Sequence, residues 1–133
     1  MMISTRGRYA LRVLIDLAEH GGDGFIPMKE VARRQEISPK YMEKIMPLLV
    51  SENMVEGIQG KGGGYRLTRE PADYTIGAIL RLTEGGLAPV ACLECGAPTC
   101  KRTSECRTLP VWNELNKRIN EYLDSVTLAD LMR

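Results

Sequence analysis

The chain has little histidine and few aromatic residues: its 133 residues include one His, one Trp and one Phe. With His20 as the only histidine, no Ser–His–Asp set is plausible, and the carboxylates are spread along solvated faces. We therefore expect no enzymatic activity. The core must be mostly aliphatic. At the end of the first predicted helix, His20 is expected to interact with the helix dipole rather than to bind a ligand.

The sequence also lacks long apolar runs and a strong net charge. No segment approaches the length of a membrane span, and residues 1–6 lack the apolar stretch of a signal peptide. We therefore expect a cytoplasmic protein with no membrane partner. The formal net charge of +1 gives no argument for or against nucleic-acid binding.

Cysteine is scarce but clustered. Four cysteines share one stretch with the spacing C-x2-C-x4-C-x5-C, at Cys92, Cys95, Cys100 and Cys106. The residues between them are polar and turn-forming, so residues 92–106 form a predicted loop. Thiols stay reduced in the cytoplasm, which favours a metal or redox role over disulfides. Four thiolates can hold tetrahedral zinc or an iron–sulfur cluster, and the spacing alone does not choose between them.

Apolar periodicity predicts a mainly α fold. Helices are expected at residues 4–20 and 28–35, from Ser38 through at least Leu49, and at residues 75–83 and 109–123. The first should end at the Gly-rich segment 21–24, and Pro47 should kink the third helix or lower its regularity. Two short strands, residues 54–58 and 65–68, flank the Gly-rich segment 59–64 and predict a β-hairpin.

Three helices followed by a hairpin is the element order of a winged helix-turn-helix, with the hairpin as the wing. The recognition helix would begin at Ser38 and place polar side chains near its N-terminus. Side chains of these types hydrogen-bond phosphates and base edges. A generic helical hairpin with a solvated polar face is the alternative. The candidate DNA-binding residues are Ser38, Lys40, Tyr41, Glu43 and Lys44, with Gln59 and Lys61 in the wing.

The last predicted helix carries a narrow apolar seam. Its members follow three- and four-residue steps, as in coiled coils: Leu109, Trp112, Leu115, Ile119 and Tyr122. A single seam with polar flanks predicts a helix that pairs with its copy, so we expect a homodimer.

These features together resemble the bacterial winged-helix repressors of the IscR, NsrR and CymR group. Three segments carry the resemblance in the first half: residues 5–10 (TRGRYA), 37–44 (ISPKYMEK) and 62–67 (GGGYRL). Cys92, residues 100–102 and Cys106 extend it, followed by Leu109, Trp112 and residues 127–131 (TLADL). The similarity covers nearly the whole chain.

The resemblance implies a homodimer that binds a double-stranded DNA operator under the control of a bound cluster. In the cluster-binding branch of the family, three cysteines are ligands, which correspond to Cys92, Cys100 and Cys106. The implied cofactor is an iron–sulfur cluster, with [2Fe–2S] favoured over [4Fe–4S].

Three positions depart from the family pattern. Some members have a histidine ligand three residues after the last cysteine, where this chain has Leu109, and others use an acidic residue near position 8, which is Arg8 here. Cys95 is then the candidate fourth ligand, and the alternatives are an exogenous ligand or a carboxylate such as Glu94, Glu105 or one from the other subunit. In the wing, Gln59 replaces an arginine that would contact the minor groove.

The sequence thus predicts a winged helix-turn-helix at residues 1–74 and, at residues 75–133, the cysteine loop and a long dimerisation helix, all in one compact domain. The predicted function is transcription regulation, as a repressor that senses iron–sulfur status or redox poise. The alternative is a DNA-binding or assembly module with a structural zinc in the cysteine loop.

Overall fold

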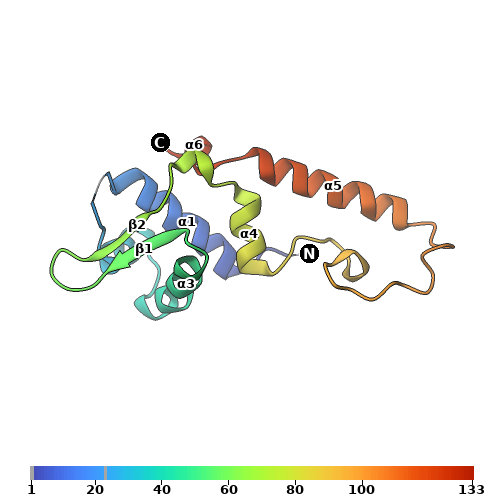
Figure 1. Cartoon of the computed structure of the whole chain (residues 1–133), viewed down its shortest axis with the longest axis horizontal. Coiled ribbons are helices and arrows are strands. Elements are labelled where there is room, and N and C mark those ends of the chain that lie inside the picture. The colour runs from blue at the N-terminus through green and yellow to red at the C-terminus, as the bar shows by residue number, and fades with distance from the viewer. Residues whose placement is uncertain (1, 23) are drawn as a thin grey trace.

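The computed structural model describes residues 2–22 and 24–133, and it is mainly helical (Figure 1). Of the segment predicted to end the first helix, residues 21–24, Asp23 lies outside the described residues. The elements are α1 (Thr5–His20), α2 (Met28–Gln35), α3 (Pro39–Ser51), β1 (Val55–Ile58), β2 (Gly64–Leu67), α4 (Ile76–Glu84), α5 (Leu109–Ser125) and α6 (Leu128–Leu131), with short 3-10 turns at Pro71–Asp73 and Ala91–Leu93.

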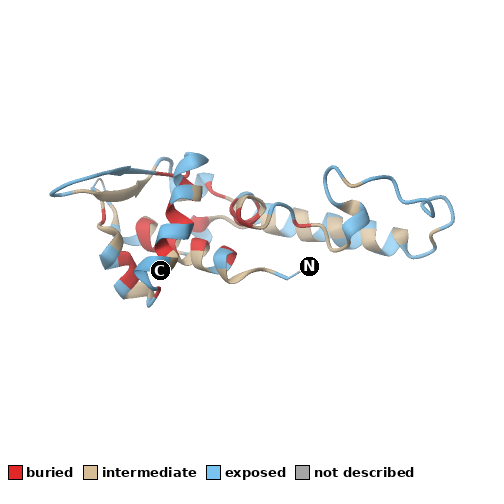
Figure 2. Ribbon diagram, turned by 90° about the horizontal axis from the view of Figure 1, so that it is seen from below, coloured by how far each residue is buried: buried red, intermediate tan, exposed pale blue. Residues whose placement is uncertain are grey.

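Helix α1 is the centre of the core. Ser4 caps it by accepting a hydrogen bond from the Gly7 backbone N–H at 3.0 Å. Ala10, Val13 and Leu14 have no exposed surface, and each large apolar side chain buried in this way stabilises the fold by about 1.5–3 kcal/mol. The buried residues gather around this helix, whereas the cysteine loop and much of α5 are exposed (Figure 2).

The helix-turn-helix is formed by α2 and α3, as predicted. The turn between them uses Glu36 at φ 55°, and Ser38 then caps α3 by accepting from the Tyr41 N–H at 3.1 Å. Pro39 occupies the first turn, where no backbone donor is needed. Helix α3 continues through the exposed Pro47 to Ser51.

The wing is an antiparallel pair of strands with Val55 opposite Leu67 and Ile58 opposite Gly64. A residue before α2 joins it: Ile26 and Tyr65 exchange backbone hydrogen bonds of 2.9 and 2.8 Å. Gly64 is required here, because its φ is +147° and a Cβ would overlap the Ile26 carbonyl. The strands match the predicted hairpin within one residue at each end.

A buried ion pair fixes α2 against α1. Asp16 is fully buried and accepts two hydrogen bonds from Arg34, at 2.6 and 3.0 Å, and one from Gln35 at 2.9 Å. Burial alone would raise the pKa of Asp16, but the hydrogen bonds and the positive charge of Arg34 lower it below its ordinary value. His20 lies in the last turn of α1, with Nδ1 3.0 Å from the Asp16 carbonyl oxygen.

Replacing Arg34 by Met should lower the free energy of unfolding by about 3 kcal/mol, because a buried carboxylate would lose its cation. Chemical denaturation at neutral pH measures this loss. The exposed ion pair of Arg118 with Glu114 provides a matched control. Arg118→Met should cost less than about 1 kcal/mol, and equal losses in the two variants would contradict this account of Asp16.

The ion pair of Asp16 and Arg34 should also make the stability of the protein depend on pH. A carboxyl whose folded-state pKa is depressed contributes stability that is fully present above its unfolded pKa of about 3.9 and is lost as the pH falls through the folded value. Wild-type protein should therefore lose more stability on acidification through this window than Arg34→Met does.

Helices α4 and α6 close the core from the other side. Leu128 of α6 is fully buried, and its N–H donates to the Tyr74 carbonyl at 3.0 Å. Tyr74 is also buried, and its hydroxyl donates to the Met54 carbonyl at 2.5 Å. The four-residue helix α6 was not predicted as a helix, although residues 127–131 were among those carrying the family resemblance.

The long helix α5 lies against α4 at one end and extends away from the core (Figure 1). Arg81 of α4 holds it by donating to both carboxylate oxygens of Asp124, at 2.8 and 2.9 Å, and to Asn120 at 2.7 Å. The helix has 17 residues and is therefore about 25 Å long. Among the described residues, no helix is both long and apolar enough to cross a bilayer.

The predicted seam of α5 is divided between two surfaces. Ile119, a member of the seam, and the neighbouring Leu123 pack against the core of the same chain, so part of the seam is covered within the chain. The reason is that α4 covers one side of the helix. Three apolar side chains on a different face remain exposed, by 58%, 41% and 67%: Val111, Leu115 and Tyr122. We call these three residues the exposed stripe.

Candidate functional site

The N-terminal end of α3 presents the predicted DNA-binding residues. Ser38, Lys40, Glu43 and Lys44 are exposed, and Tyr41 is half-buried. Ser38 has a second role, because its side chain satisfies the Tyr41 backbone N–H. A helix N-terminus carries partial positive charge, so this end of α3 suits contact with phosphates.

The wing tip presents the other two predicted DNA-binding residues, Gln59 and Lys61, both exposed. Gly60 and Gly62 flank Lys61 with φ of 92° and 77°, a backbone shape that favours glycine. The Gly63 N–H donates to the Gly60 carbonyl at 3.0 Å and closes the turn. The wing and α3 belong to the globular body, and the cysteine loop lies toward the other end of the molecule (Figure 1).

A stack of aromatic and cationic side chains connects α1 to the recognition helix. The rings of Tyr9 and Tyr41 meet edge to face, with centroids 5.1 Å apart. The Arg12 guanidinium lies 5.0 Å from the Tyr9 ring centroid, and the Lys44 ammonium lies 6.0 Å from that of Tyr41. We call Arg12, Tyr9, Tyr41 and Lys44 the cation–aromatic ladder.

Sequence reasoning did not identify Tyr9 and Arg12 as site residues. Both lie on α1, outside the helix-turn-helix, and nothing in the local pattern indicates a contact with a residue 32 positions away. Arg12 also donates to the backbone carbonyl and side chain of Gln35, at the end of α2. Helix α1 therefore contacts both helices of the helix-turn-helix with polar or aromatic side chains.

The cysteine loop brings three of its four thiols to one hollow. Cys92, Cys100 and Cys106 line a cavity of about 260 Å³, together with Leu109 and Asn113 at the start of α5. Cys95 instead lines a separate hollow of about 330 Å³ between the end of α4 and α5. The three residues that the family resemblance indicated as ligands thus share a cavity that Cys95 does not line.

The thiol of Cys106 is predisposed to ionise. Hydrogen bonds from the side chain and backbone of Thr108, the residue before α5, lower the pKa of Cys106, and the nearby Arg102 acts in the same direction. The Cys106 Sγ and Thr108 Oγ1 atoms are 3.5 Å apart. Thiolate is the form that binds metals, so these contacts favour ligation at Cys106.

The thiols of Cys92, Cys100 and Cys106 suit a metal or an iron–sulfur cluster chemically, but they do not lie close enough together to bind one. Within residues 2–22 and 24–133, no three His, Cys, Asp or Glu side chains lie together as a metal-binding group. Cys92 and Cys100 are exposed and Cys106 is half-buried. The loop would therefore have to close around its three cysteines to hold an iron centre.

The end of α4, from which the chain continues to the cysteine loop, contacts the start of α1. Ser4 donates to Glu84 Oε1 through its backbone N–H at 3.0 Å and its hydroxyl at 2.7 Å. Glu84 is the last residue of α4, two glycines before the segment that leads into the loop. Gly7 packs so closely here that a Cβ would overlap the Glu84 carboxylate. These contacts join the end of α4 to the helix that carries Tyr9.

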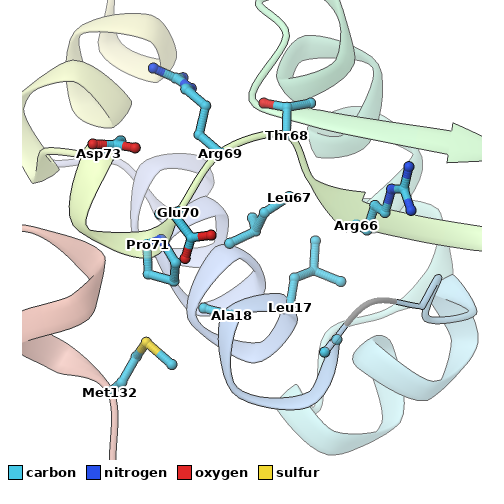
Figure 3. A pocket seen from close by; sticks show the side chains of 12 residues that line it. Leu17, Ala18, Arg66, Leu67, Thr68, Arg69, Glu70, Pro71, Asp73 and Met132 are labelled. Atoms are coloured by element: carbon cyan, nitrogen blue, oxygen red, sulfur yellow. The ribbon is translucent and has the colours of Figure 1, made fainter.

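Another hollow, of about 680 Å³, lies between the end of α1 and the segment after β2 (Figure 3). Its lining mixes apolar residues such as Leu17 and Met132 with charges of both signs, Arg69 and Asp73 among them. None of the residues predicted to bind DNA or metal lines it. The hollow therefore lies apart from the predicted DNA-binding residues and from the cysteine cavity.

Comparison with known sequences gives matches along the whole chain. The Rrf2 family model, described as "Iron-dependent Transcriptional regulator", matches residues 3–133. The chain is 38% identical over 133 residues to Protein rrf2 of Nitratidesulfovibrio vulgaris, covering 100% of this chain and 88% of that protein. It is 33% identical over 132 residues to the HTH-type transcriptional regulator IscR of Sodalis glossinidius, covering 99% of this chain and 79% of that regulator.

Comparison with solved structures agrees. CymR, the global cysteine regulator of B. subtilis, superposes with a TM-score of 0.82 at 33% identity, covering 98% of this chain and 95% of that chain. IscR of T. potens superposes with a TM-score of 0.76 at 35% identity, covering 98% and 85%. These matches confirm the predicted winged-helix fold and the prediction that the chain is no enzyme. The chain belongs to the Rrf2 family of DNA-binding transcriptional regulators.

Proposed function

We propose that this regulator is a homodimeric repressor whose binding to a double-stranded DNA operator is controlled by an iron–sulfur cluster in the cysteine loop. The observation that carries the proposal is the cavity shared by Cys92, Cys100 and Cys106. The family is described as iron-dependent, and relatives of this chain include regulators named IscR. We favour a [2Fe–2S] cluster, with [4Fe–4S] as the alternative.

The proposed DNA contacts are assigned from the charge and exposure of the side chains on α3 and at the wing tip. Lys40, Lys44 and Lys61 contact phosphates, while Tyr41 and Glu43 face base edges in the major groove. Ser38 and Gln59 complete the interface at the start of α3 and at the wing tip. The exposed stripe of α5 pairs with its copy and brings two recognition helices onto two half-sites.

Control passes through contacts within the chain. A bound cluster would cross-link the three thiolates and so order the loop. Glu84, the last residue of the helix before the loop, accepts hydrogen bonds from Ser4 and packs on Gly7 of α1. Two residues further along α1, Tyr9 contacts Tyr41 of the recognition helix. The order of the loop thereby biases the position of the DNA-reading side chains.

Anaerobic purification tests the cofactor. The proposal predicts a coloured protein with visible absorbance and equal amounts of iron and acid-labile sulfide. A colourless protein with one zinc per chain would contradict the cluster and support the alternative of a structural zinc. Specific DNA binding, measured on the same preparation, tests the proposed operator binding separately from the cofactor.

Two substitutions should separate base reading from phosphate contact. Glu43→Ala should relax the preference at one base position by about 1–3 kcal/mol, because glutamate accepts a hydrogen bond from a cytosine amino group. Lys61→Ala should weaken binding to all sequences and reduce the salt slope by about one phosphate contact. Selection from a random DNA pool, followed by salt titration, measures both effects. An unchanged preferred sequence for Glu43→Ala would remove Glu43 from the base-reading set.

A further inference from the structure

Tyr9 stands out among the residues of the cation–aromatic ladder, because it is on a helix that does not belong to the DNA-reading motif. We infer that Tyr9 is a positioning residue for base recognition: it holds the Tyr41 ring in the orientation that faces DNA. This inference rests on the proposed function, in which Tyr41 faces base edges. It concerns a residue of α1 whose ring contacts the recognition helix.

Tyr41 needs an external support. Its backbone is fixed, since its N–H donates to the Ser38 cap. Its side chain is half-buried and packs against the hydrophobic core, while the neighbouring Lys40 and Glu43 are exposed. A tyrosine has two rotatable side-chain bonds, so a fixed backbone does not fix the ring. Among the described residues, the aromatic ring packed on Tyr41 is that of Tyr9, at 5.1 Å and an interplanar angle of 69°.

Tyr9 is itself held on both sides. It is half-buried and packs against the hydrophobic core from a helix that is central to it. The Arg12 guanidinium lies 5.0 Å from its ring centroid, and Arg12 is anchored to Gln35 by hydrogen bonds to the backbone and side chain. A side chain locked by packing in a rigid helix can define the rotamer of a neighbour better than a loop residue can.

The ladder predicts which property of DNA binding depends on Tyr9. Removing the Tyr9 ring frees Tyr41 to sample other rotamers, so the contact of Tyr41 with a base is made less often. The proposed phosphate contacts of Lys40 and Lys61 do not depend on the Tyr9 ring. Base preference should therefore fall while the salt slope stays within one phosphate contact of wild type.

The test compares four single variants and one double variant by selection from a random DNA pool, affinity for the selected sequence, salt slope and thermal unfolding. Tyr9→Leu keeps an apolar side chain against the core but removes the ring, and Tyr9→Phe keeps the ring. Tyr41→Ala removes the supported side chain. Ile15→Ala is the control, because Ile15 is another half-buried residue of α1 that packs against the core.

We expect Tyr9→Leu to lose the same base preference as Tyr41→Ala and to bind the selected sequence about three- to tenfold more weakly. Tyr9→Phe and Ile15→Ala should keep the wild-type preference. In the double variant of Tyr9→Leu with Tyr41→Ala, the preference should equal that of Tyr41→Ala alone, since Tyr9 acts through Tyr41.

Two results would overturn the inference while leaving the proposed function intact: a wild-type preference in Tyr9→Leu when Tyr41→Ala loses it, or an equal loss in Ile15→Ala. A wild-type preference in Tyr41→Ala would instead remove Tyr41 from base reading and would overturn the inference with it.

Discussion

Replacing Cys100 by Ala should abolish the visible absorbance of the anaerobically purified protein, whereas replacing Cys95 by Ala should preserve it. Cys100 shares its cavity with Cys92 and Cys106. Without Cys100, the cavity would offer only the thiolates of Cys92 and Cys106, whereas iron–sulfur clusters generally have four protein ligands. Cys95 lines a different hollow, beside Arg81 and Glu84 at the end of α4. Absorbance spectra and iron content, measured on both variants prepared in parallel, provide the comparison.

The Cys95 variant decides the fourth ligand. The spacing of Cys92 and Cys95 suits two ligands to one iron, but the structure places the two residues in different hollows. Retained iron in Cys95→Ala would mean that the fourth ligand is another donor, and Leu109 offers no donor atom. Loss of iron in Cys95→Ala, to the same extent as in Cys100→Ala, would show that the loop rearranges to recruit Cys95.

The second large effect is expected at the exposed stripe. The double substitution Leu115→Asp and Tyr122→Asp should convert the dimer to a monomer, because it places two charges where the proposed interface is apolar. Binding to a two-half-site operator should then weaken by about 10²- to 10⁴-fold, since two linked contacts become independent. Sedimentation measures the first effect, and titration of the selected operator measures the second.

Lys117→Asp is the matched control for this double variant. Lys117 is exposed on the same helix but outside the exposed stripe, and its substitution changes the net charge by the same two units. It should remain dimeric. Ile119 is not a suitable probe, because it packs against the core and its substitution would destabilise the monomer. A dimeric double variant with wild-type operator affinity would exclude the exposed stripe as the interface.

Local rules predicted the helix-turn-helix closely. Ser38 followed by Pro39 indicated the start of α3, and Ser38 does cap that helix. The glycines after Ile58 indicated the wing turn, and Gly60 and Gly62 adopt positive φ there. Capping and turn formation depend on neighbouring residues, so a single sequence contains the required information.

Contacts between distant segments could not be predicted in the same way. The ring contact of Tyr9 with Tyr41 and the hydrogen bonds of Ser4 to Glu84 depend on how helices pack, which periodicity does not specify. The division of the α5 seam has the same cause, because only the position of α4 determines that Ile119 is covered. Helix α6 is too short for a helical period to be recognisable.

In the proposed function, the state of the cysteine loop controls DNA binding. The most direct test of this control is the affinity of one anaerobic preparation for its selected operator, measured before and after the cluster is removed by a chelator. The affinity of the wild-type protein for the operator should differ at least about fivefold between the two states, which is the lower range of allosteric coupling. In Glu84→Ala, which lacks the hydrogen bonds to Ser4, the two affinities should differ much less. Equal affinities of the wild-type protein in both states would contradict the proposed control.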